Sequence, residues 1–321
     1  MTEIEPRTRY CVRHLVAPAT LLALLANCLV LLSGCASQNA VVVPSVNQDT
    51  RVRIIVIHHT SSNFQDSLNI LTKDSGNPVS SHYLVPEPND ASYTDNKLKL
   101  YKLVPEEDRA WHAGKSYWAG KTALNDMSVG IEIVNQTYCR KSELATPADA
   151  TDQAPDTICF YPDFAESQMQ MLIDLLKGIT ARHTEVKPTD IVGHSDIAPQ
   201  RKIDPGPRFP WQRLYQLGFG AWFDDDTVFK YWEQFRLHQP PTLTLQTALH
   251  EYGYEIELNG MHDEQSRNVV RAFQMHFRPW LVNREFDAET VAILYALLEK
   301  YRPEKLELLQ SMDESPAAAG G

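Results

Sequence analysis

The fold is decided by one short stretch, which reads Val52-Arg53-Ile54-Ile55-Val56-Ile57-His58. Branched aliphatic side chains that follow one another almost without a break predict a strand buried on both faces of a sheet. A second such strand is expected over Ser128–Asn135, and it carries Glu132 inside a buried segment. A histidine at the end of one buried strand and a glutamate within another are candidates for a functional site.

One amphipathic helix is expected over Glu166–His183. Its apolar residues recur three or four positions apart and form a single stripe that can pack on the sheet, namely Met169, Leu172, Ile173, Leu176 and Ile179. Pro188 follows this helix, and a loop rich in proline and glycine then runs from Gly193 to Phe209. Because helices alternate with strands, the class is α/β or α+β.

The C-terminal part has a different pattern. A connecting segment is expected over 216–241, ending in Pro240-Pro241. We predict a three-helix domain over 242–303 and a disordered tail over 304–321. The three helical patterns are Leu243–Tyr252, Glu264–Phe277 and Ala288–Tyr301.

Length and charge limit the possible functions. A chain of 321 residues favours two folded units and a processed leader over one core. The chain has 41 acidic and 30 basic residues, a net charge of -11, and therefore lacks the positive surface that phosphate backbones require. We expect no nucleic-acid partner and, after the leader, a soluble monomer.

The first 34 residues read as a leader. Basic residues precede an apolar stretch, Leu15–Leu32, which ends in Leu32-Ser33-Gly34-Cys35. A membrane-spanning anchor is the alternative, but Pro18 and Asn27 interrupt the stretch. The ending resembles the bacterial lipobox, which implies a lipoprotein signal peptide over 1–34, a lipid on Cys35 and a tether over 35–50. By the same resemblance, Ala36 in place of aspartate points to the outer membrane, with the protein facing the periplasm.

Two other cysteines, Cys139 and Cys159, remain if the leader is removed and Cys35 carries the lipid. In an oxidising compartment such a pair usually forms a disulfide. The segment between them reads as a loop, and closing a loop of about 20 residues contributes roughly 3 kcal/mol. Two separate buried thiols are the alternative.

Three residues are candidate metal ligands: His58, His194 and Asp204. Two imidazoles and one carboxylate form a catalytic zinc set in which the fourth position stays open for water. Zinc lowers the pKa of that water from 15.7 to about 7. Each residue alone has an ordinary structural interpretation, since a lone histidine is more often a surface or core residue.

Five motifs, taken together, resemble the zinc amidase family that includes peptidoglycan recognition proteins and bacterial N-acetylmuramoyl-L-alanine amidases. They occur in the family's order: Ile57-His58-His59-Thr60, Ser81-His82-Tyr83, Trp111-His112-Ala113-Gly114, Ser128-Val129-Gly130-Ile131-Glu132, and the run from Gly193 to Gly206. The resemblance implies an α/β fold with a mixed central sheet flanked by helices over 51–215. It also selects His58 over His59 as the ligand.

The resemblance assigns roles to further residues. Glu132 matches the family's catalytic base, and Lys202 matches a lysine that stabilises the oxyanion. Trp111, His112 and Asn125 match substrate-groove positions. Ser81 and Asp204 follow the bacterial branch, whereas phage and animal relatives often carry tyrosine and cysteine there; this favours a glutamate mechanism. Gln200 departs from the branch, in which glycine is common.

The C-terminal helices resemble a peptidoglycan-binding module, most clearly at Phe273-Gln274. The implied function is a zinc-dependent N-acetylmuramoyl-L-alanine amidase that cuts the amide between N-acetylmuramic acid, or its 1,6-anhydro form, and L-alanine, with peptidoglycan or muropeptides as partners. Two alternatives stay open: a wall receptor without catalysis, and a zinc lipoprotein acting on another amide. A receptor is disfavoured because its ligand set would usually be incomplete.

Overall fold

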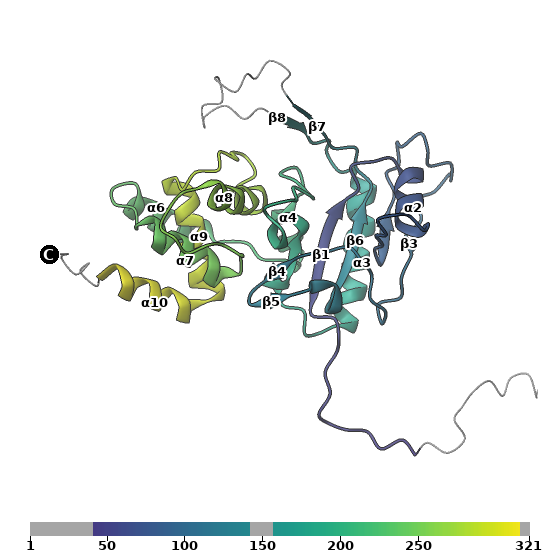
Figure 1. Ribbon diagram of the computed structural model, residues 1–321, viewed down its shortest axis with the longest axis horizontal. Helices are drawn as coiled ribbons and strands as arrows, with labels where there is room; N and C mark the ends of the chain where they lie inside the picture. The colour runs from purple at the N-terminus through teal and green to yellow at the C-terminus, as the bar shows by residue number, and fades with distance from the viewer. Residues whose placement is uncertain (1–40, 142–156, 315–321) are drawn as a thin grey trace, which may run out of the picture. The chain divides into compact units, whose positions relative to one another are not determined.

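The computed structural model describes residues 41–141 and 157–314 (Figure 1). Residues 50 onward form one unit by their contacts, and the preceding residues belong to another. Residues 41–49 are exposed and have neither helix nor strand. Within the described ranges, no helix is both long enough and apolar enough to cross a membrane. The expected signal peptide and Cys35 lie outside the described residues.

A five-stranded mixed sheet lies at the centre of the fold, in the order β3-β2-β6-β1-β9. Strands β2, β6, β1 and β9 are parallel, and β3 runs antiparallel to β2. Every residue of β1 is buried, as the unbroken aliphatic run predicts. The strands are β1 Ile54–His59, β2 Tyr83–Val85, β3 Tyr101–Lys102, β6 Ser128–Ile133 and β9 Ile191–Gly193.

Helices cover the two faces of this sheet. On one face α3, Glu166–Arg182, packs its apolar stripe against alternate residues of β6, such as Ile131. On the other face α2, Phe64–Thr72, packs against Leu84 of β2. The predicted α/β class, with a mixed central sheet flanked by helices, is therefore confirmed.

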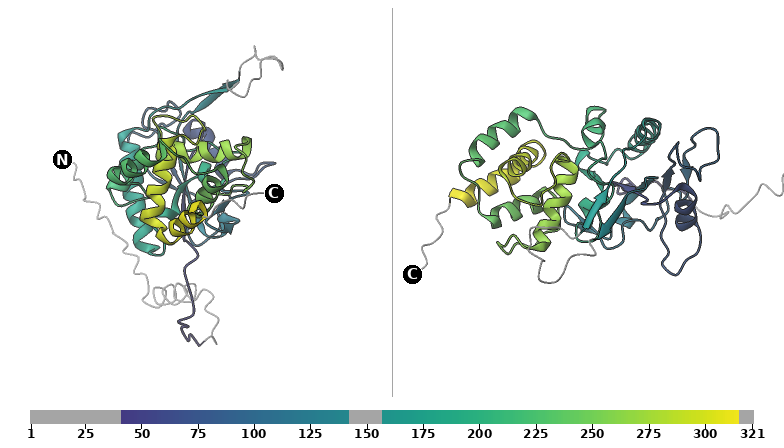
Figure 2. Two further views of the ribbon diagram at one scale, coloured as in Figure 1. Left: turned by 90° about the vertical axis from the view of Figure 1, so that its left-hand side faces the viewer. Right: turned by 90° about the horizontal axis from the view of Figure 1, so that it is seen from above.

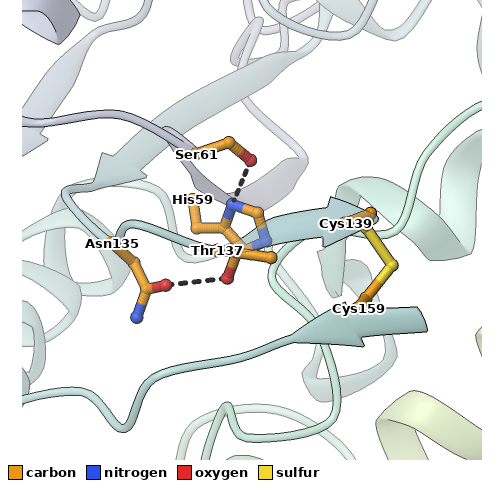
Figure 3. The surroundings of a disulfide bond; sticks show 6 residues. All are labelled: His59, Ser61, Asn135, Thr137, Cys139 and Cys159. Atoms are coloured by element: carbon orange, nitrogen blue, oxygen red, sulfur yellow. Dashed lines mark hydrogen bonds between the residues drawn. A yellow bond between two sulfur atoms is a disulfide. The ribbon is translucent and has the colours of Figure 1, made fainter. Parts of the chain in front are cut away.

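Short elements join these layers. In the part of the chain that the structure describes, these are the 3-10 turns η1 Leu124–Asp126 and η2 Pro188–Asp190 and the short helices α4 His194–Ile197 and α5 Trp211–Gln216. Two hairpins in the described ranges form separate two-stranded sheets: β4 Tyr117–Trp118 with β5 Lys121–Thr122, and β7 Tyr138–Lys141 with β8 Thr157–Phe160. The structure joins the facing residues Cys139 and Cys159 of the second hairpin by a disulfide (Figure 3).

The C-terminal part is a group of helices packed beside the sheet (Figures 1 and 2). The three expected helices are present as α7 Thr242–Tyr252, α8 Glu264–Phe277 and α9 Ala288–Tyr301. Two more helices extend this group, α6 Asp225–Phe235 and α10 Pro303–Glu314.

The structure places a helix in each of two segments for which no helix was predicted. The connecting segment 216–241 contains α6, which packs on α9 because Tyr231 and Phe235 are buried against Tyr295. The prediction of a disordered tail over 304–321 is wrong for α10. Leu306 and Leu309 are buried there, and α10 packs on α7 and α9. Residues 315–321 lie outside the described ranges.

Candidate metal centre

The site forms where three parallel strands end at the same edge of the sheet. His58 of β1 is in register with Glu132 of β6, and Ile57 with Gly193 of β9. Residues in register on neighbouring strands point to the same face, so His58 and Glu132 project together. Gly193 directly precedes α4, and therefore the first residue of α4, His194, emerges beside His58. The carboxyl edge of a parallel sheet is where α/β proteins usually bind ligands.

Three ligand atoms meet at this edge. The Nδ1 atoms of His58 and His194 lie 2.9 Å apart, and Oδ2 of Asp204 lies 3.2 Å from the first and 3.0 Å from the second. All three residues are buried. The backbone carbonyl of Asp204 accepts a hydrogen bond from the N–H of Ser195, 2.8 Å away, which ties the third ligand to α4.

The remaining ring nitrogen of His58 belongs to a chain of hydrogen bonds. His58 Nε2 lies 3.0 Å from His112 Nδ1, and His112 Nε2 lies 3.1 Å from the hydroxyl of Ser128. That hydroxyl donates to the carbonyl oxygen of Leu124, 2.6 Å away. Because the Ser128 hydroxyl uses its proton in this bond, its oxygen accepts the hydrogen bond from His112 Nε2–H. His112 Nδ1 then carries no proton and accepts the hydrogen bond from His58 Nε2–H. This order leaves Nδ1 of His58 free to bind a metal.

His194 has a matching arrangement. Its Nε2 lies 3.4 Å from the carbonyl oxygen of Ala113, which can only accept a hydrogen bond, and 3.5 Å from Nη2 of Arg201, which can only donate one. A proton on Nε2, facing the carbonyl, leaves Nδ1 free. Asn125 fixes the loop that carries this carbonyl. Its Oδ1 accepts the backbone N–H groups of His112 and Ala113, at 3.1 and 2.8 Å. Arg201 also donates to the Ala113 carbonyl.

The protonation states suit cation binding. Burial and the neighbouring His194 lower the pKa of His58 to about 4, so the imidazole is neutral at pH 7. Burial alone would raise the pKa of Asp204, but His194 and His58 outweigh it and hold that pKa well below its usual range. A neutral imidazole and an ionised carboxylate are the forms in which these side chain types ligate a metal.

Glu132 and Lys202 lie beside these three residues, in a pocket of about 320 Å³ that they line together with His112, His194 and Asp204. Glu132 Oε1 is 4.0 Å from His58 Nδ1, and its Oε2 is buried without a hydrogen-bond partner among the described residues. Burial, and secondarily Asp204, raises the pKa of Glu132 to about 8. A carboxyl group with such a pKa can exchange protons near neutral pH.

The donor set fits Zn²⁺. Nitrogen and oxygen ligands about 2 Å from one tetrahedral Zn²⁺ lie roughly 3.3 Å from one another, and the three atoms here lie between 2.9 and 3.2 Å apart. The unpartnered Oε2 of Glu132 points to a further polar group in the pocket. Zinc would thus be held by His58, His194 and Asp204.

The other predicted site residues differ in their surroundings. His59, the alternative ligand, is not in the cluster; its Nδ1 lies 3.2 Å from the Ser61 hydroxyl (Figure 3). Trp111 is half exposed, at 51% of its surface. The structure gives His112 and Asn125 positioning contacts, and a contact of Trp111, His112 or Asn125 with substrate stays a prediction.

Sequence reasoning missed two supporting residues. Ser128 ends the hydrogen-bond chain described above. Gly130 leaves room for the His112 ring, since a Cβ at this position would lie 2.4 Å from that ring. Both residues belong to the motif that ends at Glu132. Their role depends on the His112 ring lying over β6, and the sequence of the motif does not show which side chain lies there.

A parallel sheet edge with two imidazoles, a carboxylate and a neighbouring glutamate defines a metal-dependent hydrolase site. A profile of the N-acetylmuramoyl-L-alanine amidase family matches residues 48–207, and a profile of a peptidoglycan binding domain matches residues 238–294. The chain is 43% identical to N-acetylmuramoyl-L-alanine amidase AmiD of Escherichia coli over 282 residues, which is 84% of this chain and 95% of that protein. This chain belongs to the N-acetylmuramoyl-L-alanine amidase family and is an amidase.

Solved structures agree with this assignment. The crystal structure of AmpDh3 from Pseudomonas aeruginosa matches with a TM-score of 0.72 and 41% identity, covering 83% of this chain and 98% of that one. The E. coli AmiD structure matches with a TM-score of 0.66 and 43% identity, covering 80% and 93%. The 1,6-anhydro-N-acetylmuramyl-L-alanine amidase AmpD of E. coli is 31% identical over 119 residues, which is 37% of this chain and 52% of that protein.

The hydrogen-bond chain through His112 yields a test. His112→Ala removes the acceptor that fixes the proton on His58 Nε2, so zinc affinity should fall by about tenfold, within the range typical of residues that support metal ligands. Competition with a chromophoric chelator measures this affinity. The matched control is the neighbouring Trp111→Ala, which should bind zinc as the wild type does. Unchanged affinity in His112→Ala would show that the chain is not needed to orient His58.

Proposed function

We propose that this amidase uses zinc to hydrolyse the amide bond between N-acetylmuramic acid and the L-alanine of the stem peptide, in muropeptides that include the 1,6-anhydro form. The observation that carries the proposal is the triangle of His58, His194 and Asp204 beside the unpartnered carboxyl of Glu132. Named substrates of the relatives support the chemistry. The E. coli AmiD structure is a complex with anhydro-N-acetylmuramic acid-L-Ala-D-gamma-Glu-L-Lys, and an AmpDh3 structure contains anhydromuramic pentapeptide.

Zinc, when bound, supplies a Lewis acid that activates water and polarises the scissile carbonyl. Glu132 accepts the proton of the attacking water, because its carboxyl is near the ligands and its Oε2 has no competing hydrogen-bond partner in the described part of the chain. The same carboxyl then delivers a proton to the departing nitrogen of L-alanine. Burial raises the pKa of Glu132 in the metal-free protein, and this favours the protonated carboxyl that the second step requires.

Lys202 lines the pocket two residues before Asp204. A cation there favours negative charge on the carbonyl oxygen as the tetrahedral species forms. The backbone N–H of Lys202 donates to the carbonyl of Ala198, 3.1 Å away, so the loop that carries the lysine is anchored to the end of α4. Because the negative charge that the Lys202 side chain stabilises develops only in the transition state, removal of this side chain should affect kcat more than metal content.

The choice of bond is tested by mass spectrometry of the products from purified peptidoglycan. The proposal expects free stem peptides that begin with L-alanine and glycan chains that retain N-acetylmuramic acid. Products cut within the peptide or within the glycan would overturn it. Anhydro-muropeptides and ordinary muropeptides, supplied separately at equal concentration, compare the two forms of the sugar.

Glu132→Ala tests the mechanism. Zinc should stay bound, because all three ligands remain, while kcat should fall by roughly 100-fold or more, as is typical when a general base is lost. Zinc content by atomic emission and turnover of a defined muropeptide are the two measurements. Glu185→Ala is the matched control, since this glutamate is exposed and lies outside the pocket. Retained turnover in Glu132→Ala would place the base elsewhere.

We further propose that Cys35 carries a lipid, which holds the enzyme at the outer membrane facing the periplasm, and that the helical module binds the wall. The support is the order of basic, apolar and small residues before Cys35, followed by an exposed segment at 41–49 without helix or strand. The match of residues 238–294 to a peptidoglycan binding domain supports the second part.

Cys35→Ala tests the anchor. This variant should incorporate no labelled palmitate and should keep its leader, whereas a secreted chain that starts at Ser37 should leave the membrane fraction and remain active. Membrane retention of the chain that starts at Ser37 would contradict the anchor.

A further inference from the structure

A buried carboxylate connects the metal site to the C-terminal helices. Asp196 lies in α4, two residues after the ligand His194, and only 1% of its surface is exposed. Its Oδ2 accepts the backbone N–H of Gly193, 2.7 Å away, at the start of α4. One backbone hydrogen bond does not compensate the cost of burying the Asp196 carboxylate, because a buried charge without further partners is strongly destabilising.

The other partners of Asp196 come from the C-terminal helices. The hydroxyl of Tyr254, just after α7, donates to Oδ1 at 2.7 Å, and Nδ1 of His276 in α8 lies 2.7 Å from Oδ2. Tyr254 and His276 are themselves buried. The His276 ring stacks between Trp211 and Phe277, with 3.9 Å between ring centroids on each side. The donor that faces Asp196 is therefore held in a fixed orientation.

Helix α4 depends on such support. It has four residues, a single turn, and isolated turns of helix are unfavourable without tertiary contacts. This turn begins with His194, and the N–H of Ser195 holds the carbonyl of Asp204. Two of the three metal ligands thus take their positions from α4, and Asp196 fixes α4 from the side that faces α8 (Figure 1).

The loop that follows α4 is held by the same module. The side-chain amide of Gln200 donates to the carbonyl of Gln265 at 3.0 Å and accepts from Asn268 at 3.1 Å. Arg271 of α8 donates to the carbonyl of Pro199, 2.9 Å away. This loop carries Lys202 into the pocket.

We propose that the C-terminal helices are a structural part of the metal site, with Tyr254 and His276 acting through Asp196 as positioning residues for the ligands His194 and Asp204. The module then has a role in catalysis that is separate from binding the wall. This inference rests on the zinc site proposed above. It implies that loosening the contact between Asp196 and the module weakens zinc binding in the amidase half of the molecule.

Three substitutions in the full chain test the contact. Tyr254→Phe removes only the hydroxyl that donates to Asp196, and His276→Leu removes the ring donor. His276→Asn keeps an N–H near the position of Nδ1 and should restore much of the loss. We expect the zinc dissociation constant to rise about tenfold in His276→Leu, the lower end of the range for outer partners of metal ligands. The visible spectrum of the Co²⁺-substituted protein should change with it, since it reports the ligand geometry.

Phe235→Leu is the matched control. Phe235 is a buried residue of α6 in the same module, and its ring packs on Tyr231 of α6 and Tyr295 of α9. It should lower the melting temperature of the zinc-free protein while the zinc dissociation constant and the Co²⁺ spectrum stay as in the wild type. If Tyr254→Phe and His276→Leu behave like this control, the proposal is wrong and the module only packs against the amidase. A wild type that binds no zinc would overturn both this inference and the proposed function.

Discussion

The close approach of two imidazole nitrogens and one carboxylate oxygen is the constraint on which the rest of the structure depends. His58, His194 and Asp204 bring these atoms to within 3.2 Å of one another in a buried place. Such an arrangement needs three backbone segments held in fixed register and a proton kept away from each Nδ1. The parallel pairing of β1 with β6 and β9 provides the register. His112 and the carbonyl of Ala113 accept hydrogen bonds from the Nε2–H groups of His58 and His194, and the Nδ1 atoms of these two histidines therefore carry no proton.

The contacts that hold the metal ligands in position come both from the amidase sheet and from the C-terminal part of the chain. On one side, His112 lies over Gly130 of β6 and passes its hydrogen bond to Ser128. On the other side, Asp196 accepts from Tyr254, just after α7, and pairs with His276 of α8, residues that are 58 and 80 positions away in sequence. A site held from two sides in this way keeps its geometry before a metal or substrate binds, which is what electrostatic catalysis requires. The C-terminal helices and the amidase sheet therefore contribute side chains to one buried cluster.

The local sequence pattern was sufficient to predict the two buried strands that carry His58 and Glu132. The aliphatic run before His58 predicts a buried strand, and the strand around Glu132 has the same character, so both side chains could be expected at a sheet edge. The roles of Lys202 and Asp204 came from resemblance, because a lysine and an aspartate in a loop rich in proline have no periodic signal. Contacts between distant segments were not predictable. Asp196, Tyr254 and His276 look ordinary in their own segments, and only the packing of α8 against α4 brings them together. The same reason explains why α6 and α10 were not predicted, since both helices pack on α9, a contact between separate segments.

X-ray absorption at the zinc edge, on the full chain loaded with one equivalent of zinc, tests the central claim most directly. A shell of nitrogen and oxygen at about 2.0–2.1 Å, including two imidazoles and no sulfur, is the expected result. His58→Ala should reduce the imidazole count to one while the remaining zinc becomes weakly held. A sulfur ligand at about 2.3 Å, or a spectrum that His58→Ala leaves unchanged, would contradict the assignment of His58, His194 and Asp204 as the metal site.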